Sequence, residues 1–340
     1  MTAIRKIRGE LVSKLFPSGI PRLWCPTLTH FSAPRKPDES RIRAHLESLS
    51  NHVSGILVPG STGEGWEMSD ADVHALLDIV LDAAQAAGIQ VLIGVLKTDL
   101  DAMLSCLNSI EQLLTHPAIA GITVCPPKGS ELSQLEIQDA LARILQRGWP
   151  TALYQLPQVT LNAMSTETVV ALSAQFPNFI LFKDTSGEDV VAQSAVQGNL
   201  DLGGVWMVRG AEQGGYARWL RSAGGPYDGF LLSTANVFSP QLAEIQDLLD
   251  DGDHAAATAL STRLEAVVQN VFTLVRGFPT GNAFANANKL LDHCLAFGDE
   301  AIHAPPPLLY SGAQLPDNWV ADAYRVLKQQ SLLPTVGYWR

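Results

Sequence analysis

A lysine stands at the end of a short apolar run, where a buried amine could act as a nucleophile. The run FILF occupies residues 179–182, and Lys183 follows it directly in FILFKDTSG. Lysine is rarely buried without a partner. In an apolar pocket, a lowering of about three units from the usual pKa near 10.4 leaves a large fraction of the amine uncharged at pH 7. Two interpretations follow, a surface lysine that opens a loop and a buried nucleophile.

Two other segments carry groups that suit the same chemistry. GSTGEG spans residues 60–65 and includes the hydroxyls of Ser61 and Thr62, and YQLP begins with Tyr154. A neutral amine adds to a ketone carbon and loses water to form an iminium, which accepts the electrons of an adjacent carbon–carbon bond. Tyr154 could carry protons between amine, carbinol oxygen and substrate. The hydroxyls and backbone N–H groups of Ser61 and Thr62 suit a carboxylate.

Taken singly, each segment also has a purely structural interpretation. The glycine-rich segment matches neither the dinucleotide-binding nor the phosphate-binding fingerprint, and an ordinary strand-to-helix turn would look the same. A tyrosine at the end of a strand is commonly a core residue. Glu64 is expected to help start the following helix. The combination is more specific than its parts, because three separate strands would place compatible groups at one rim.

Short apolar runs alternate with longer amphipathic segments, which is typical of βα units. Strands are predicted at residues 22–28, 54–59, 90–96, 119–125, 151–155, 179–182, 204–208 and 228–232. Helices are predicted between them at residues 40–52, 69–88, 101–115, 132–146, 165–175, 187–196 and 212–222. This α/β pattern indicates a (β/α)8 TIM barrel, with a doubly wound open sheet as the second candidate. The active site of such a barrel lies at the C-terminal ends of its strands, so Ser61, Tyr154 and Lys183 would face one pocket.

The strand pattern stops after residue 236, and helical patterns continue towards the C-terminus. They are predicted at residues 240–250, 254–276, 282–297 and 317–330. The predicted organisation is an N-terminal extension at residues 1–19, the barrel at residues 20–236 and a C-terminal helical extension at residues 237–340 that packs on the barrel. The first sixteen residues are basic and amphipathic and lack the apolar centre of a secretory signal, so an additional surface helix is expected there.

The composition disfavours several classes of partner. The 340 residues are 17% charged with a formal net charge of -11, which argues against nucleic acid and anionic membrane surfaces. No uncharged apolar stretch is long enough to span a bilayer. The four scattered cysteines form no CxxC pair, which predicts reduced thiols and a cytoplasmic protein. The eight histidines show no metal-binding spacing, so no metal is expected. No organic cofactor is expected either, because a covalent Schiff base on the lysine would take its place.

Together the motifs resemble those of the dihydrodipicolinate synthase / N-acetylneuraminate lyase family, over about residues 20–300. GSTGE resembles the family's G-[ST]-T-G-E, YQLP its Y-N-[VI]-P and KDTSG its K-[EQ]-[AT]-[ST]-G. STAN at residues 233–236 is similar to the family's S-[VT]-x-N after the eighth strand. The resemblance implies a class I, Schiff-base aldolase-type lyase on a TIM barrel, assembled as a homo-oligomer, a dimer or a tetramer.

The resemblance also implies roles for individual residues. Lys183 would form the Schiff base with a 2-oxo acid such as pyruvate, and Tyr154 would be the proton shuttle. Ser61 and Thr62, next to Gly60, would bind the pyruvyl carboxylate or serve the relay. Further substrate-binding positions implied by the family are Gly210, Glu212 and Ser233.

Two positions depart from the synthases of this family. Val159 stands where those enzymes have an arginine that binds the second substrate's carboxylate. Pro126-Pro127-Lys128 stands where a neighbouring subunit provides them with a tyrosine, and Lys128 is one candidate to replace it. Lysine biosynthesis is therefore not expected. The motifs favour a lyase or aldolase that releases or condenses pyruvate, with a deoxy sugar acid as substrate. A 2-oxo acid dehydratase or hydratase would use the same lysine and tyrosine, and a non-catalytic barrel that binds a small carboxylate is a further hypothesis.

Overall fold

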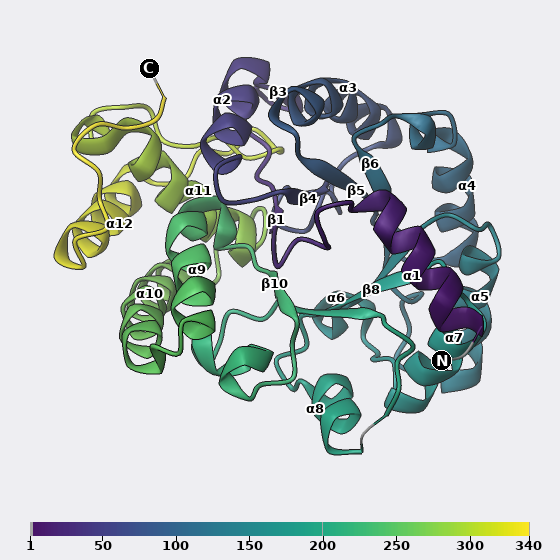
Figure 1. The fold of residues 1–340 in the computed structure, drawn as a ribbon. Coiled ribbons are helices and arrows are strands. Elements are labelled where there is room, and N and C mark those ends of the chain that lie inside the picture. The colour runs from purple at the N-terminus through teal and green to yellow at the C-terminus, as the bar shows by residue number, and fades with distance from the viewer. Residues whose placement is uncertain (1–2, 199, 340) are drawn as a thin grey trace.

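The computed structural model describes residues 3–198 and 200–339, and in them a parallel barrel forms the centre (Figure 1). Residues 1–2 of the predicted N-terminal extension and residue 340 of the C-terminal region lie outside the described residues. The strands, in barrel order, are β1 Leu23–Pro26, β4 Gly55–Val58, β5 Gln90–Val95, β6 Ile119–Val124, β7 Thr151–Gln155, β8 Phe179–Asp184, β9 Trp206–Arg209 and β10 Gly229–Leu231. Because β1 pairs with both β4 and β10, the sheet is closed. The predicted TIM barrel is confirmed, and the open sheet was the wrong alternative.

Helices follow the strands and cover the outside of the barrel (Figure 1). They are α2 Glu39–Leu49, α3 Asp70–Ala87, α4 Leu100–Ile110, α5 Gln134–Leu145, α7 Thr166–Gln175, α8 Val190–Gln197 and α9 Ala235–Asp250. The short helix α6 Pro157–Thr160 lies at the end of β7, inside this ring (Figure 1). Helix α3 shows how local signals set the bounds. The side chain of Ser69 accepts a hydrogen bond from the N–H of Asp72, and Gly88 ends the helix in the left-handed region at φ 69°. A small hairpin, β2 Phe31–Ala33 and β3 Lys36–Pro37, precedes α2.

The helix predicted at residues 212–222 is wrong. The structure has two short 3-10 helices there, η2 Ala217–Trp219 and η3 Arg221–Ala223. Gly214 and Gly215 adopt φ angles of 81° and 79°, which lie in the left-handed region and cannot continue a right-handed helix. The chain after β9 is therefore an irregular segment, and it ends near the start of β10, where Arg221 forms an ion pair with Asp228.

The C-terminal region is helical, as the sequence predicts. It contains α10 His254–Leu274, α11 Ala283–Phe297, η4 Gly298–Glu300 and α12 Asp317–Gln329, which pack beside one edge of the barrel (Figure 1). The boundary predicted after residue 236 falls inside α9. Among the helices of the described residues, none has the length and apolar character needed to cross a membrane.

The N-terminal helix α1, Ala3–Leu15, is present but is more than a surface addition. The guanidinium of Arg8 is buried and donates to backbone carbonyls that include those of Phe179 at 2.7 Å and Phe176 at 2.9 Å. Phe16, just beyond the helix, packs edge-to-face on Trp24 of β1 at 5.8 Å between ring centres. Helix α1 therefore contributes to the core at the N-terminal end of the barrel, opposite the expected active site.

Candidate active site

Lys183 lies inside the barrel near the C-terminal end of β8, with 3% of its surface exposed. Successive residues of a strand point to opposite sides. Leu181 belongs to the apolar cluster of the barrel interior, whereas Phe182 belongs to the cluster beneath the helices. The same alternation directs Lys183 inward. Burial lowers the pKa of its amine to about 7, because the protein solvates a charge less well than water does. The surface-lysine interpretation is therefore wrong.

Tyr154 lies beside this amine on the neighbouring strand. β7 and β8 pair in register at Tyr154 and Lys183, and the Nζ atom lies 4.0 Å from the centre of the phenol ring. Burial raises the pKa of the phenol, and the hydroxyls of Ser61 and Thr185 act in the opposite direction because hydrogen bonds stabilise a phenolate. The two groups therefore form a close amine–phenol pair at the end of the barrel where catalysis is expected.

The glycine-rich segment after β4 is a tight, buried turn whose backbone N–H groups differ in their partners. Those of Gly63 and Gly65 donate to the carbonyl of Gly60, at 3.1 and 3.0 Å. Within the described residues, the backbone N–H groups of Ser61 and Thr62 have no hydrogen-bond partner. Two free N–H groups beside two hydroxyls make a site that a carboxylate would satisfy.

Two side chains that no motif singles out hold this turn in place. Trp66 donates its indole N–H to the hydroxyl of Ser61 over 2.8 Å, and Asn282, just before α11, donates to the Ser61 carbonyl over 2.8 Å. Trp66 also packs, together with Val159, against the apolar cluster of Cys125, Tyr154 and Leu156. The position where an arginine would be expected in the synthases thus belongs to an apolar wall, and Lys128 is exposed.

Gly210, directly after β9, leaves space for the lysine. A Cβ atom built on it would lie 2.8 Å from the Cε atom of Lys183 and would overlap the hydroxyl of Thr185. A larger residue would therefore displace the lysine side chain or the strand that carries it. The structure places Gly210 against the predicted nucleophile.

Glu212 and Ser233 are buried and bonded to each other. The carboxylate of Glu212 accepts from the hydroxyl of Ser233 at 2.6 Å and from the backbone and hydroxyl of Thr234 at 3.0 and 2.8 Å. Burial raises the pKa of Glu212, and these hydrogen bonds act in the opposite direction. Glu212 also lines a cavity of about 560 Å³ with Arg276 and Phe284. A direct bond from Glu212 to a substrate would therefore have to replace one that already exists.

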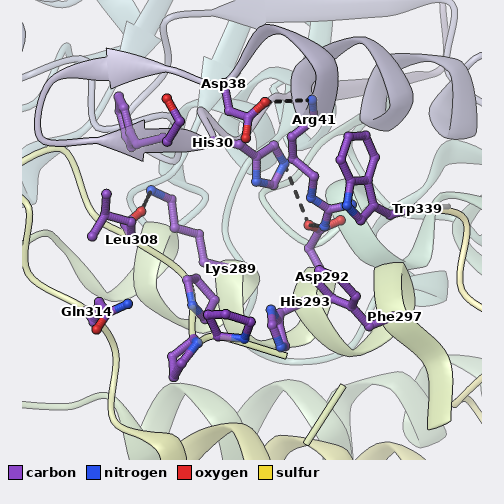
Figure 2. Close-up of a pocket in the computed structure, with 15 residues that line it drawn as sticks. His30, Asp38, Arg41, Lys289, Asp292, His293, Phe297, Leu308, Gln314 and Trp339 are labelled. Carbon is purple, nitrogen blue, oxygen red and sulfur yellow. Dashed lines mark hydrogen bonds and ion pairs between the residues drawn. The ribbon is translucent and has the colours of Figure 1, made fainter. Parts of the chain in front are cut away.

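Glu64 does not start the following helix, whose N-cap is Ser69, so that prediction is wrong. Its buried carboxylate forms an ion pair with the ammonium of Lys289 and accepts from the backbone N–H of Tyr310 at 2.9 Å. The ammonium of Lys289 also donates to the carbonyl of Leu308 at 2.9 Å (Figure 2). Glu64 thus ties the loop after β4 to the C-terminal region.

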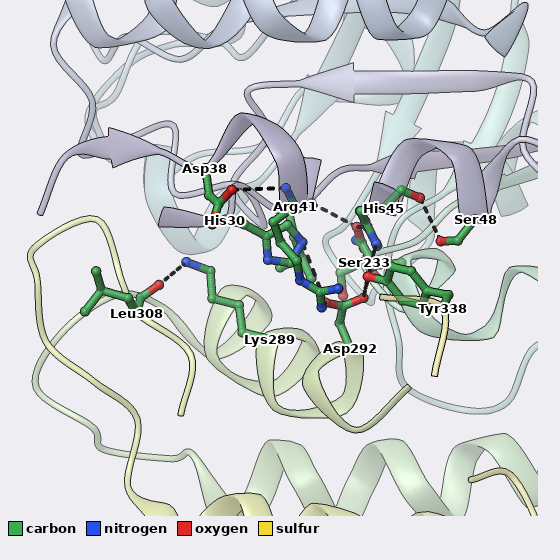
Figure 3. Close-up of polar contacts among 12 residues, drawn as sticks. His30, Asp38, Arg41, His45, Ser48, Ser233, Lys289, Asp292, Leu308 and Tyr338 are labelled. Carbon is green, nitrogen blue, oxygen red and sulfur yellow. Dashed lines mark hydrogen bonds and ion pairs between the residues drawn. The ribbon is translucent and has the colours of Figure 1, made fainter. Parts of the chain in front are cut away.

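His30, His45 and Asp292 place possible metal-ligand atoms within 4.8 Å of one another. The carboxylate of Asp292 accepts from Arg41 at 2.7 Å and from the hydroxyl of Tyr338 at 2.6 Å (Figure 3). Burial would raise the pKa of Asp292, but Arg41 and His45 hold it well below its usual range. Arg41, His30 and Asp292 also line a cavity of about 350 Å³ (Figure 2). Because the guanidinium already compensates the carboxylate and would repel a second cation, this set fits an ion-pair cluster better than a metal site.

The model of the dihydrodipicolinate synthetase family matches residues 22–282. A 4-hydroxy-tetrahydrodipicolinate synthase of Xanthomonas campestris pv. campestris is 29% identical over 221 residues, which are 64% of this chain and 68% of that protein.

Solved structures show the same fold at low identity. The prophage protein YagE of E. coli K12, a member of the dihydrodipicolinic acid synthase family in complex with pyruvate, is 19% identical, with a TM-score of 0.72 and coverage of 91% of this chain and 98% of that one. A Sulfolobus 2-keto-3-deoxygluconate aldolase in complex with D-KDPG is 16% identical, with a TM-score of 0.70 and coverage of 92% and 99%.

Proposed function

Because the chain belongs to the dihydrodipicolinate synthetase family, we propose that it is a Schiff-base-forming lyase or aldolase that acts on a 2-oxo acid. The observation that carries the proposal is the buried amine of Lys183, whose pKa is lowered to about 7 and whose nitrogen lies 4.0 Å from the ring centre of Tyr154. A neutral amine attacks a ketone without a metal or an organic cofactor. The pyruvate held by the similar structure of YagE supports pyruvate as product or substrate.

In the proposed reaction, the amine of Lys183 attacks C2 of the oxo acid, and one proton moves from the nitrogen to the carbonyl oxygen to give a carbinolamine. Tyr154 protonates the departing hydroxyl, water leaves, and the iminium forms beside a tyrosinate. In cleavage, the tyrosinate takes the proton of the C4 hydroxyl, the C3–C4 bond breaks, and its electrons move into the iminium to give an enamine and an aldehyde. Tyr154 then protonates C3, and water releases pyruvate from the lysine. Condensation is the same sequence in reverse.

The turn after β4 would hold the carboxylate of the oxo acid. The free N–H groups of Ser61 and Thr62 and the hydroxyl of Thr62 offer donors that are already positioned, so binding orders few additional groups. The hydroxyl of Ser61 would also stabilise the tyrosinate at Tyr154, because it acts to lower the pKa of that phenol. Gly210 would leave room for the side chain of Lys183. Glu212 and Ser233 would line the site, each held in position by the hydrogen bond between them.

The identity of the oxo acid is a separate part of the proposal. A deoxy sugar acid is the substrate class that the motifs favour, and the similar aldolase from Sulfolobus supports it. The apolar wall of Trp66 and Val159 beside Tyr154 favours a distal group with little polar surface. Substrate tests should therefore include 2-oxo-3-deoxy sugar acids as well as 4-hydroxy-2-oxo acids with apolar groups at C4. Product analysis separates C–C cleavage from dehydration, which would use the same lysine and tyrosine.

Reductive trapping tests the proposal. The protein is incubated with pyruvate and borohydride, and the modified peptide is mapped by mass spectrometry. A reduced adduct on Lys183 that is lost in Lys183→Ala would support the iminium route. If a panel of 2-oxo acids gives no adduct, the proposed chemistry is wrong, and the result favours a barrel that binds a small carboxylate without turnover.

Location and assembly stay predictions. The four cysteines are free and buried, which supports the reducing, cytoplasmic setting inferred from their spacing. A homo-oligomer, either a dimer or a tetramer, is proposed from the family, and light scattering coupled to gel filtration measures it directly.

A further inference from the structure

The hydroxyl of Ser61 has a neighbour that donates a hydrogen bond and cannot accept one. The indole nitrogen of Trp66 lies 2.8 Å from the hydroxyl oxygen, and an indole N–H is a donor only. Trp66 is partly buried and packs with Val159 on the cluster that contains Tyr154 and Leu156. The indole is therefore held beside Ser61 by apolar packing as well as by its hydrogen bond.

This contact limits what the hydroxyl of Ser61 can do. One of its lone pairs is occupied by Trp66, while its own proton is available to Tyr154, whose pKa it acts to lower. A hydroxyl relays a proton by accepting one from a neighbour and releasing its own to another. The neutral indole has no lone pair in the ring plane that could receive a proton. A proton that reaches Ser61 from Tyr154 therefore has no exit through Trp66.

We propose that Trp66 is a positioning residue that fixes Ser61 as a hydrogen-bond donor to Tyr154 and closes the outer end of the proton relay. Tyr154 then exchanges its proton with the bound substrate and only slowly with solvent. The inference rests on the proposed function. The inference also bears on the tyrosine that this chain lacks after β6. Lys128, the candidate to replace it, is exposed, whereas the indole of Trp66 in the same chain contacts the hydroxyl of Ser61.

The closed relay has a chemical consequence that can be measured with pyruvate. In the iminium at Lys183, tyrosinate 154 takes a proton from the C3 methyl, the C–H electron pair forms a C2–C3 double bond, and the C–N π electrons move to nitrogen. Return of the same proton to C3 restores the iminium without any isotope exchange. Replacement of that proton by a deuteron from D2O before the return labels the methyl group. The yield of label for each iminium formed therefore reports how open the relay is.

The experiment compares methyl deuteration with iminium formation. Proton NMR in D2O follows the methyl signal of pyruvate, and borohydride trapping on Lys183 gives the rate of iminium formation for the same protein. In Trp66→Phe the loss of a hydrogen bond worth about 1 kcal/mol should raise deuteration per iminium by about fivefold. Trp66→His, which supplies a nitrogen that can accept a proton, should raise it further. Trp219→Phe is the matched control, because Trp219 is also partly buried and donates to the carbonyl of Gly214 at 3.2 Å.

The outcomes separate this inference from the proposed function. If the wild type forms no adduct at Lys183, the proposed function fails, and the inference fails with it. If adducts form normally while deuteration per iminium is the same in wild type, Trp66→Phe and Trp66→His, only the closed relay is wrong. The hydrogen bond is tested independently of turnover by the indole N–H resonance that Trp66→Phe removes. The indole proton of Trp66 should exchange slowly with D2O, and its resonance should shift in Ser61→Ala. A freely exchanging resonance that does not shift would overturn the inference.

Discussion

Two buried lysines lie near the loops at the C-terminal end of the barrel, and they differ in their partners. Lys183 and Lys289 are 3% and 2% exposed, and each side-chain nitrogen lies over an aromatic ring, that of Tyr154 at 4.0 Å and that of Phe31 at 4.5 Å. Lys289 forms an ion pair with Glu64. Within the described residues, Lys183 has no carboxylate at ion-pair distance. The same residue type therefore occurs twice in almost the same degree of burial.

The difference shows that burial alone does not make a lysine reactive. Desolvation lowers the pKa of both amines, and the carboxylate of Glu64 opposes that effect at Lys289. Lys289 can therefore keep its charge and join the C-terminal helices to the loop after β4. Lys183 lacks such a partner and can be neutral near pH 7, which suits a nucleophile and costs stability. Four predictions test this contrast, beginning with the largest expected effect.

Lys183→Met should abolish turnover, with a loss of at least about a thousandfold, because no other amine replaces the nucleophile. The same variant should unfold at a higher temperature than wild type, since it removes an unpaired amine from an apolar site. The folded pKa of about 7 lies below the unfolded value near 10.4. The destabilisation by Lys183 is therefore complete below pH 7 and is relieved as the pH rises from 7 towards 10. Calorimetry at pH 6 and pH 9 should show a larger stability gain at pH 6; a loss of stability at both would contradict the contrast.

Lys289→Met should instead destabilise the fold by about 3–5 kcal/mol, because it leaves the carboxylate of Glu64 buried and unpaired. Denaturant unfolding measures the change. The double variant Glu64→Gln/Lys289→Met removes both charges and should recover part of the loss. If the single and the double variant are equally unstable, packing and not the ion pair accounts for the role of Lys289.

Tyr154→Phe should lower kcat by about a hundredfold if the phenol relays protons. Because the ring stays, Lys183 should keep its apolar contact, and borohydride should still trap some iminium at longer times. Steady-state kinetics and unfolding temperature are measured together. Turnover near that of wild type would remove the proton-transfer role, whereas a large fall in the unfolding temperature would point to a structural one.

The pH dependence should follow the amine of Lys183. The neutral form attacks, so kcat/KM should rise with pH up to about 7 and level off above it, and should be about tenfold lower at pH 6. Cys125 lies in the buried cluster that contains Tyr154, and burial raises the pKa of its thiol to about 12, so it carries no charge near pH 7. Cys125→Asp should therefore raise the pKa of Lys183 and move the midpoint upwards by about one unit or more, while Cys125→Ser serves as the control. An unchanged midpoint in Cys125→Asp would mean that another group sets the profile.

Local sequence signals predicted most of the fold and the centre of the site. The eight strand segments match the strands of the barrel to within a few residues, and Ser69 and Gly88 bound α3 as expected. Lys183 and Tyr154 were recognisable because each lies near the C-terminal end of a buried strand. The signals failed at residues 212–222, where amphipathic spacing suggested a helix but Gly214 and Gly215 take left-handed angles.

The periods of two and 3.6 residues, the helix caps and the three motifs are properties of neighbouring residues, so the amino-acid sequence was enough to specify a barrel with an amine and a phenol at its mouth. The partners of those groups were decided by tertiary structure. Glu64 and Lys289 are 225 positions apart, and Asn282 meets Ser61 across 221 positions. No local pattern marks such pairs, because the attraction acts between groups that only the folded chain brings into contact. Folding therefore decided which buried lysine is paired with a carboxylate, because it brought Glu64 to Lys289.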